Sequence, residues 1–137
     1  MLPASGLLKR ANAIVLGNGE AHKDENIFYL LESAPTDDTL FLIIKRNSKP
    51  VLLVSPLEIG NYANRKDVIV KELSKNSLKE ELGKIRGRVG LNFDCQTVNQ
   101  AAKLKKYTRA KPVDISGYFE SARETKTQKE IKKKKES

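Results

Sequence analysis

Short apolar runs alternate along this chain with polar segments that carry helix-start signals. Two of the runs, residues 39–44 (TLFLII) and 51–54 (VLLV), are continuously apolar and do not alternate with polar residues. A strand of this kind is buried on both faces of its sheet, so both faces need a covering layer. Strands that alternate with helical segments at these spacings predict an α/β domain with helices on both faces.

The pattern predicts one sheet and the approximate residue ranges of its strands. A turn-rich segment, residues 45–50, separates the two continuous runs, which predicts a hairpin with a longer loop and therefore a mixed sheet. The run at 26–31 (NIFYLL) is too short to assign by periodicity. The expected strands are residues 13–16, 39–44, 51–54, 68–70, 88–91 and 111–115.

Three Ser/Thr-x-x-Glu capping boxes mark expected helix starts, at residues 55–58, 77–80 and 127–130. The first predicts a helix to about residue 63, with Pro56 at its first position. The second predicts a helix that ends near residue 85, and the third begins a lysine-rich helix. A further helix is expected over residues 94–107, with apolar positions at Val98, Ala101, Ala102 and Leu104.

The net charge of +9 comes entirely from the second half of the 137-residue chain. Residues 1–70 hold 8 Lys/Arg and 8 Asp/Glu, whereas residues 71–137 hold 18 and 9. Such asymmetry is typical either of a nucleic-acid face or of lysine-rich solvated helices. Because no aromatic platform or binding motif accompanies the charge, the solvated interpretation is favoured. The basic positions concerned are Lys103, Lys105, Lys106, Arg109, Lys111 and residues 126–135.

The residues that most often carry chemistry are scarce. The single histidine, His22, and the single cysteine, Cys95, are too few for a zinc site. No nucleophile elbow, Walker loop or dinucleotide fingerprint occurs. Carboxylates that could hold Mg²⁺ are more often turn and cap residues, and they are Asp24/Glu25, Asp37/Asp38 and Asp94. The sequence therefore predicts no catalytic, cofactor-binding or metal-binding residue.

The compartment follows from cysteine usage and hydropathy. One cysteine allows no internal disulfide and favours a reducing compartment. No apolar run approaches the length that spans a bilayer, and the N-terminus has no long apolar segment. We expect a cytoplasmic protein with no membrane partner.

Several segments together have the order and spacing of one known protein domain. Residues 13–16 followed by Asn26-Ile27-Phe28-Tyr29-Leu30 are similar to its first strand and N-I-x-Y-L signature. Residues 40–44 and 49–55 are similar to its hairpin, and Val89-Gly90-Leu91 to its closing strand. The signature that follows this domain is matched by Arg123, Lys126, Thr127, Glu130 and Ile131. Together these segments resemble the N-terminal domain of the creatinase/prolidase family, and the last signature resembles the entry to its catalytic domain.

The resemblance implies a three-layer domain of ribonuclease H-like architecture over residues 1–122, and the start of a linker helix over 123–137. It implies a separate C-terminal catalytic domain, absent here, that cleaves the bond before proline with two divalent metal ions (Mn, Co or Zn). The ligands of those ions would be two Asp, one His and two Glu. This chain would then be non-catalytic, would contribute to a homodimer, and would help to cover an active site.

Two departures from the family bear on that covering and dimer role. The segment after Tyr29-Leu30 reads Leu31-Glu32-Ser33-Ala34 in place of the usual Thr-Gly-Phe, and the first helix is short. No substrate contact is therefore carried over to this chain.

Other interpretations remain open at this point. The chain could be a stand-alone basic module for nucleic acid, or a catalytically dead regulatory relative. The parent could be a Xaa-Pro dipeptidase, an aminopeptidase, or an enzyme with creatinase-like chemistry on guanidino compounds.

Overall fold

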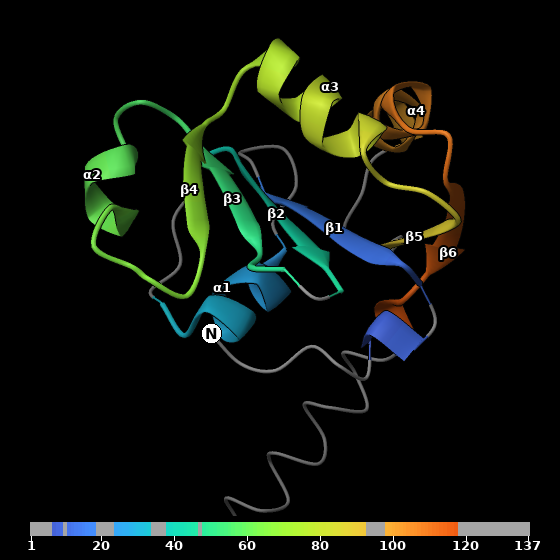
Figure 1. Ribbon diagram of the computed structural model, residues 1–137, viewed down its shortest axis with the longest axis horizontal. Coiled ribbons are helices and arrows are strands. Elements are labelled where there is room, and N and C mark those ends of the chain that lie inside the picture. The colour runs from blue at the N-terminus through green and yellow to red at the C-terminus, as the bar shows by residue number, and fades with distance from the viewer. Residues whose placement is uncertain are drawn as a thin grey trace, which may run out of the picture.

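Six strands form one mixed sheet that lies between helices on its two faces (Figure 1). The computed structural model describes residues 7–9, 11–18, 24–33, 38–46, 48–92 and 98–117. The prediction of an α/β domain with a mixed sheet is confirmed. The strands are β1 (Ala13–Asn18), β2 (Leu40–Lys45), β3 (Val51–Val54), β4 (Ile69–Glu72), β5 (Arg88–Leu91) and β6 (Lys111–Asp114). The helices are η1 (Leu7–Lys9), α1 (Glu25–Leu31), α2 (Ile59–Tyr62), α3 (Lys75–Gly83) and α4 (Val98–Tyr107).

The strand order is β4-β3-β2-β1-β5-β6, and only β2 runs against its neighbours. The β2–β3 hairpin is confirmed, with Leu40 opposite Val54 and Ile43 opposite Val51. The parallel pairs β3–β4, β1–β5 and β5–β6 place the carboxyl ends of five strands at one edge of the sheet.

Both faces of the central strands are buried, as the continuous apolar runs predicted. All six residues of β1 are buried, and they alternate between two cores. Ile14 and Leu16 pack in the core under α1, whereas Ala13 and Val15 pack in the core under α3 and α4. The sheet is therefore the middle layer of three.

The run that periodicity left unassigned forms helix α1. Asp24 caps its N-terminus by accepting a hydrogen bond from the Asn26 N–H. At the other end Glu32 adopts a left-handed conformation (φ 57°), and Arg65 Nη1 donates to the Leu31 carbonyl at 2.6 Å. Local capping and one long-range arginine thus fix a helix of only seven residues.

The two capping boxes within the described residues both need correction. The helix predicted over residues 55–63 is observed as α2 but its predicted start is wrong, because residues 55–58 form a turn in which the Glu58 N–H donates to the Ser55 carbonyl. Helix α2 begins only at Ile59, and Glu58 makes no side-chain cap. Helix α3 begins at Lys75, earlier than predicted, because its capping box pairs Ser74 with Ser77. Both predicted capping boxes have the right sequence spacing, but the hydrogen bonds that the structure forms at these helix starts are different ones.

The remaining predicted strands are confirmed within one or two residues of their expected bounds. The predicted helix over 94–107 is observed as α4, which begins at Val98, and residues 93–97 lie outside the described residues. The third capping box, residues 127–130, also lies outside them. In the part of the chain that is described, no helix has the length and apolar character needed to cross a bilayer.

Gly90 lies in the middle strand of a parallel trio and leaves no room for a side chain. A Cβ atom at this position would lie 2.6 Å from Ile14 Cδ1 and 2.9 Å from Ile115 Cγ2, and both isoleucines are fully buried. We expect Gly90→Ala to lower the free energy of unfolding by about 1–2 kcal/mol through overpacking.

Urea denaturation checks this prediction, with Gly83→Ala as the matched control. A Cβ atom at Gly83 meets nothing within 4 Å, so the control should not be destabilised. Equal midpoints for Gly90→Ala and the unsubstituted protein would contradict the packing argument.

Candidate functional site at the carboxyl edge of the sheet

Polar side chains gather at the edge where five strands end and β2 begins. Asn18 ends β1, Asn92 follows β5, and Asp24 precedes α1. In open α/β sheets this edge is where ligand sites and functional loops lie. It is therefore the first place to examine for chemistry.

Asp24 connects the elements that meet at this edge. One of its carboxylate oxygens accepts from the Asn26 N–H at 3.0 Å, and the other accepts from Asn92 Nδ2 at 3.2 Å. Asn18 Oδ1 in turn accepts from the Asp24 N–H at 3.1 Å, and Asn18 Nδ2 donates to the Asp38 carbonyl at 3.0 Å. The network joins β1, α1, β2 and β5.

The network is almost completely buried. Exposed fractions are 0% for Asn18, 1% for Asp24, 6% for Asn26 and 2% for Asn92. A buried carboxylate that accepts hydrogen bonds from an amide and a backbone N–H fixes the chain around it. This arrangement holds α1 and the start of β2 at the carboxyl edge of the sheet.

The carboxylates considered for a metal site do not come together. Among the described residues no group of three or more His, Cys, Asp or Glu is placed to hold a metal ion. Asp24 serves the network, whereas Glu25 and Asp38 are exposed. His22, Asp37, Asp94 and Cys95 lie outside the described residues. The side chains of the described part therefore do not fit a metal centre of the prolidase kind.

The basic positions predicted as solvated surface are exposed where the structure describes them. They are Lys103, Lys105, Lys106, Arg109 and Lys111, on or just after α4. Residues 126–135 lie outside the described part.

A second buried carboxylate, Glu81 of α3, lies on the other face of the sheet. It is 2% exposed and accepts from Lys71 at 2.9 Å, Lys45 at 3.1 Å and Lys84 at 3.4 Å. Burial alone would raise the pKa of Glu81, but the hydrogen bonds from Lys71 and Lys45 hold it at about 2. The same contact with Glu81 raises the pKa of Lys71. The cluster is a salt bridge network between α3, β2 and β4.

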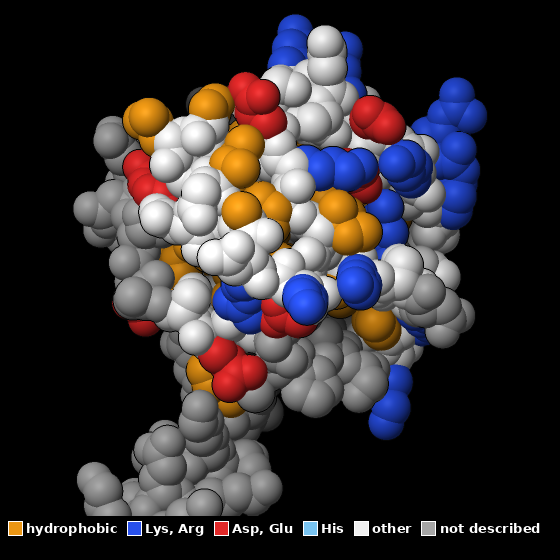
Figure 2. Space-filling view, turned by 60° about the vertical axis from the view of Figure 1, so that its left-hand side comes forward, with side chains coloured by type: hydrophobic (Ala, Val, Ile, Leu, Met, Phe, Trp, Pro, Cys, Tyr) orange, Lys and Arg blue, Asp and Glu red, His pale blue; other side chains and the backbone are white. Residues whose placement is uncertain are grey.

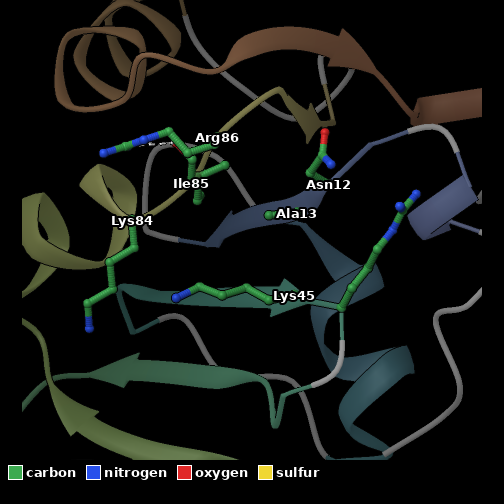
Figure 3. Close-up of a pocket in the computed structure, with 7 residues that line it drawn as sticks. Asn12, Ala13, Lys45, Lys84, Ile85 and Arg86 are labelled. Atoms are coloured by element: carbon green, nitrogen blue, oxygen red, sulfur yellow. Dashed lines mark hydrogen bonds between the residues drawn. The ribbon is translucent and has the colours of Figure 1, made fainter.

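A basic pocket adjoins the Glu81 cluster near the amino end of β1. Its volume is about 250 Å³. The ammonium groups of Lys45 and Lys84 extend to the same side of it, which agrees with their shared partner Glu81 (Figure 3). The lining residues are Asn12, Ala13, Lys45, Arg46, Lys84, Ile85 and Arg86. The pocket is thus separate from the Asp24 network at the opposite edge of the sheet.

Sequence reasoning missed Asn18, Asn92 and Glu81. An Asn directly after an apolar strand is the available signal for the first two, but it is equally typical of an ordinary turn. Nothing near Glu81 in sequence marks it, because Lys45 and Lys71 come from strands on other parts of the chain.

The creatinase/prolidase N-terminal domain model matches residues 9–125. Comparison with curated proteins by sequence alone gives no match. Solved structures give strong matches of the fold.

The creatinase/prolidase N-terminal domain of an X-Pro dipeptidase from Streptococcus pyogenes is similar with a TM-score of 0.66 and 20% identity. That match covers 82% of this chain and 88% of the other. An X-Pro aminopeptidase from Thermotoga maritima matches with a TM-score of 0.72 and 16% identity, over 88% of this chain and 35% of that one. The prolidase from Pyrococcus furiosus matches with a TM-score of 0.65 and 14% identity, over 86% and 33%. Since the family model spans most of the sequence, the chain belongs to the creatinase/prolidase N-terminal domain family.

Proposed function

We propose that this chain is the non-catalytic N-terminal domain of a metal-dependent Xaa-Pro dipeptidase or aminopeptidase of the cytoplasm. Residues 1–122 form the domain, and residues 123–137 begin the linker helix to a catalytic domain. The observation that carries the proposal is the share of each matched protein that this fold covers. The same fold occupies 88% of a separately solved N-terminal domain but only 33% and 35% of a prolidase and an aminopeptidase.

The use of the buried carboxylates favours a non-catalytic role for this domain. Asp24 caps α1 and bonds Asn92, and Glu81 forms ion pairs with three lysines, so both are used in holding the fold. The catalytic domain would supply the Asp, His and Glu ligands of two divalent metal ions (Mn, Co or Zn), which activate water for hydrolysis. In the parent protein this chain would help to cover the active site and would contribute dimer contacts.

Two preparations test the proposal. The purified 137-residue chain with Mn²⁺ should not hydrolyse Xaa-Pro dipeptides or peptides with proline in the second position. Native protein captured from its source with an antibody against this domain should hydrolyse at least one of them, and chelation should abolish the activity. Hydrolysis by the isolated chain, or captured protein without any proline-specific activity, would overturn the proposal.

A further inference from the structure

The sheet has two outer edges, β6 and β4, and they differ in what they offer to another strand. In β6 the N–H groups of Lys111 and Ile115 donate inward to β5, to the carbonyls of Gly87 and Leu91. The residues that face outward are Pro112 and Asp114, and of these Pro112 has no N–H to donate. The β6 edge is thereby blunted against strand addition.

The β4 edge has no such block. Ile69 and Leu73 donate inward to the Pro50 and Val54 carbonyls at 2.8 Å and 2.6 Å. The alternate residues, Val70 and Glu72, therefore direct their N–H and C=O groups outward, and neither is proline. The Glu72 carbonyl also accepts from Ser77 Oγ at 2.9 Å, which leaves it a second lone pair for a partner strand. No described strand pairs with the outer side of β4, although helix α2 lies beside β4 and contributes Tyr62 to the core that Val70 packs against (Figure 1).

The side chains along β4 are exposed to an unusual degree for a strand. The burial of Ile69–Glu72 is exposed, intermediate, exposed, exposed, and Ile69 has an exposed fraction of 42%. Figure 2 turns this side of the molecule toward the viewer, and hydrophobic side chains reach its surface among Lys/Arg and Asp/Glu side chains. A partner for this edge must match both kinds of residue.

The sequence of residues 66–72, Lys-Asp-Val-Ile-Val-Lys-Glu, is complementary to itself when reversed. An antiparallel pair of two such segments, centred on Ile69, places opposite charges across both outer positions and apolar residues across the inner ones. Directly opposed pairs of this kind stabilise a sheet, and like charges there destabilise it. The facing pairs are Lys66 with Glu72, Asp67 with Lys71, Val68 with Val70, and Ile69 with its own copy. Within one chain Asp67 already pairs with Arg65 and Lys71 with Glu81, so the charge pair specific to the contact is Lys66 with Glu72.

The hydrogen-bond phase of β4 fits the same register. Because Ile69 bonds inward to β3, the central pair is a non-hydrogen-bonded pair, in which side chains approach most closely. Val70 faces outward and would exchange both of its main-chain bonds with Val68 of the second copy. Pairing would thus extend β4 by three residues, to residues 66–72.

We infer that β4 pairs antiparallel with β4 of a second copy of this chain, joining two sheets across a two-fold axis. The contact is isologous, and the β6 edge is blunted by Pro112, so assembly stops at the dimer. One strand pair buries a small area, so the dimer is weak and depends on concentration. The inference rests on the proposed function in one respect: β4 is the surface through which the proposed homodimer would form.

Charge exchange at Lys66 and Glu72 tests the pairing. Both side chains are exposed, and neither has an ion-pair partner among the described residues, so the monomer should be unaffected. Sedimentation equilibrium of the 137-residue chain should show a monomer–dimer equilibrium. Lys66→Glu and Glu72→Lys should each weaken it by on the order of tenfold, since each creates two like-charge pairs across the axis.

An equimolar mixture of the two variants should associate about as well as the unsubstituted protein. One variant carries a carboxylate at both outer positions of the segment, and the other carries an ammonium group at both. In the mixed dimer each outer pair therefore joins a carboxylate of one chain to an ammonium group of the other. The doubly exchanged protein should recover for the same reason. Lys103→Glu, a matched charge change on α4, should have no effect on association.

A purely monomeric chain at the highest soluble concentration, or a mixture no tighter than either variant, would overturn the inference. A full-length protein whose β4 amides are protected by its own catalytic domain would do so as well. None of these measurements uses peptidase activity, so the dimer surface and the proposed function can fail independently.

Discussion

Asp24→Ala is expected to lower the free energy of unfolding by about 3 kcal/mol. The substitution removes the cap of α1, which alone is worth about 1 kcal/mol. It also leaves the Asn92 side-chain amide buried without its acceptor, at about 1–3 kcal/mol. Denaturant unfolding followed by circular dichroism measures the loss.

The conservative variant Asp24→Asn separates the two contributions. An asparagine still caps α1, but its amide cannot replace both carboxylate oxygens for Asn26 and Asn92. Its loss should be about half that of Asp24→Ala. If Asp24→Ala and Asp24→Asn were both within 0.5 kcal/mol (roughly the scatter of surface substitutions) of the unsubstituted protein, the network would not hold this edge.

Glu81→Gln is expected to cost about 2 kcal/mol at neutral pH, because three lysines lose their shared carboxylate. The expected loss of stability is smaller than for a fully buried ion pair, because these lysines are 23–50% exposed and can turn toward water.

The dependence on pH gives the cleaner readout for Glu81. Its pKa is about 2 in the folded protein against an ordinary value of 4.5. A depressed pKa stabilises the fold above the unfolded value, and this stability is lost as pH falls from about 4.5 through 2. The free energies of unfolding of the two proteins should therefore converge toward pH 2, as urea titrations at several pH values would show.

Glu80→Gln is the matched control for this series. Glu80 is 66% exposed and lies 3.7 Å from Lys84, so its replacement should change little. If the free energy of unfolding of Glu81→Gln fell at acid pH as much as that of the unsubstituted protein, the role given to Glu81 would be contradicted.

Much of the fold was predictable because burial leaves a strong pattern in the strands. Continuous apolar runs predicted two covered faces, and the turn-rich residues 45–50 predicted the hairpin. The capping boxes were less reliable, since Ser55 and Ser77 had the right spacing but different partners. Which residue caps a helix depends on where the preceding strand ends, and the local sequence does not determine that position.

The candidate site was much harder to predict than the fold. Asn92 bonds Asp24 across a separation of 68 residues, and Lys45 bonds Glu81 across 36. Pairs of this kind can be predicted only when the sheet order is known. For example, β1 and β5 are far apart in sequence and become neighbours only through a crossover. Short-range motifs carry no signal for them.

The mass of the native polypeptide tests the central claim most directly. An antibody against this domain should detect, in denatured extracts of the source, a single chain far larger than 15.3 kDa, about three times its size if it matches the peptidases that share the fold. A native polypeptide of 15.3 kDa would contradict the account, because the domain would then have no catalytic partner on its own chain.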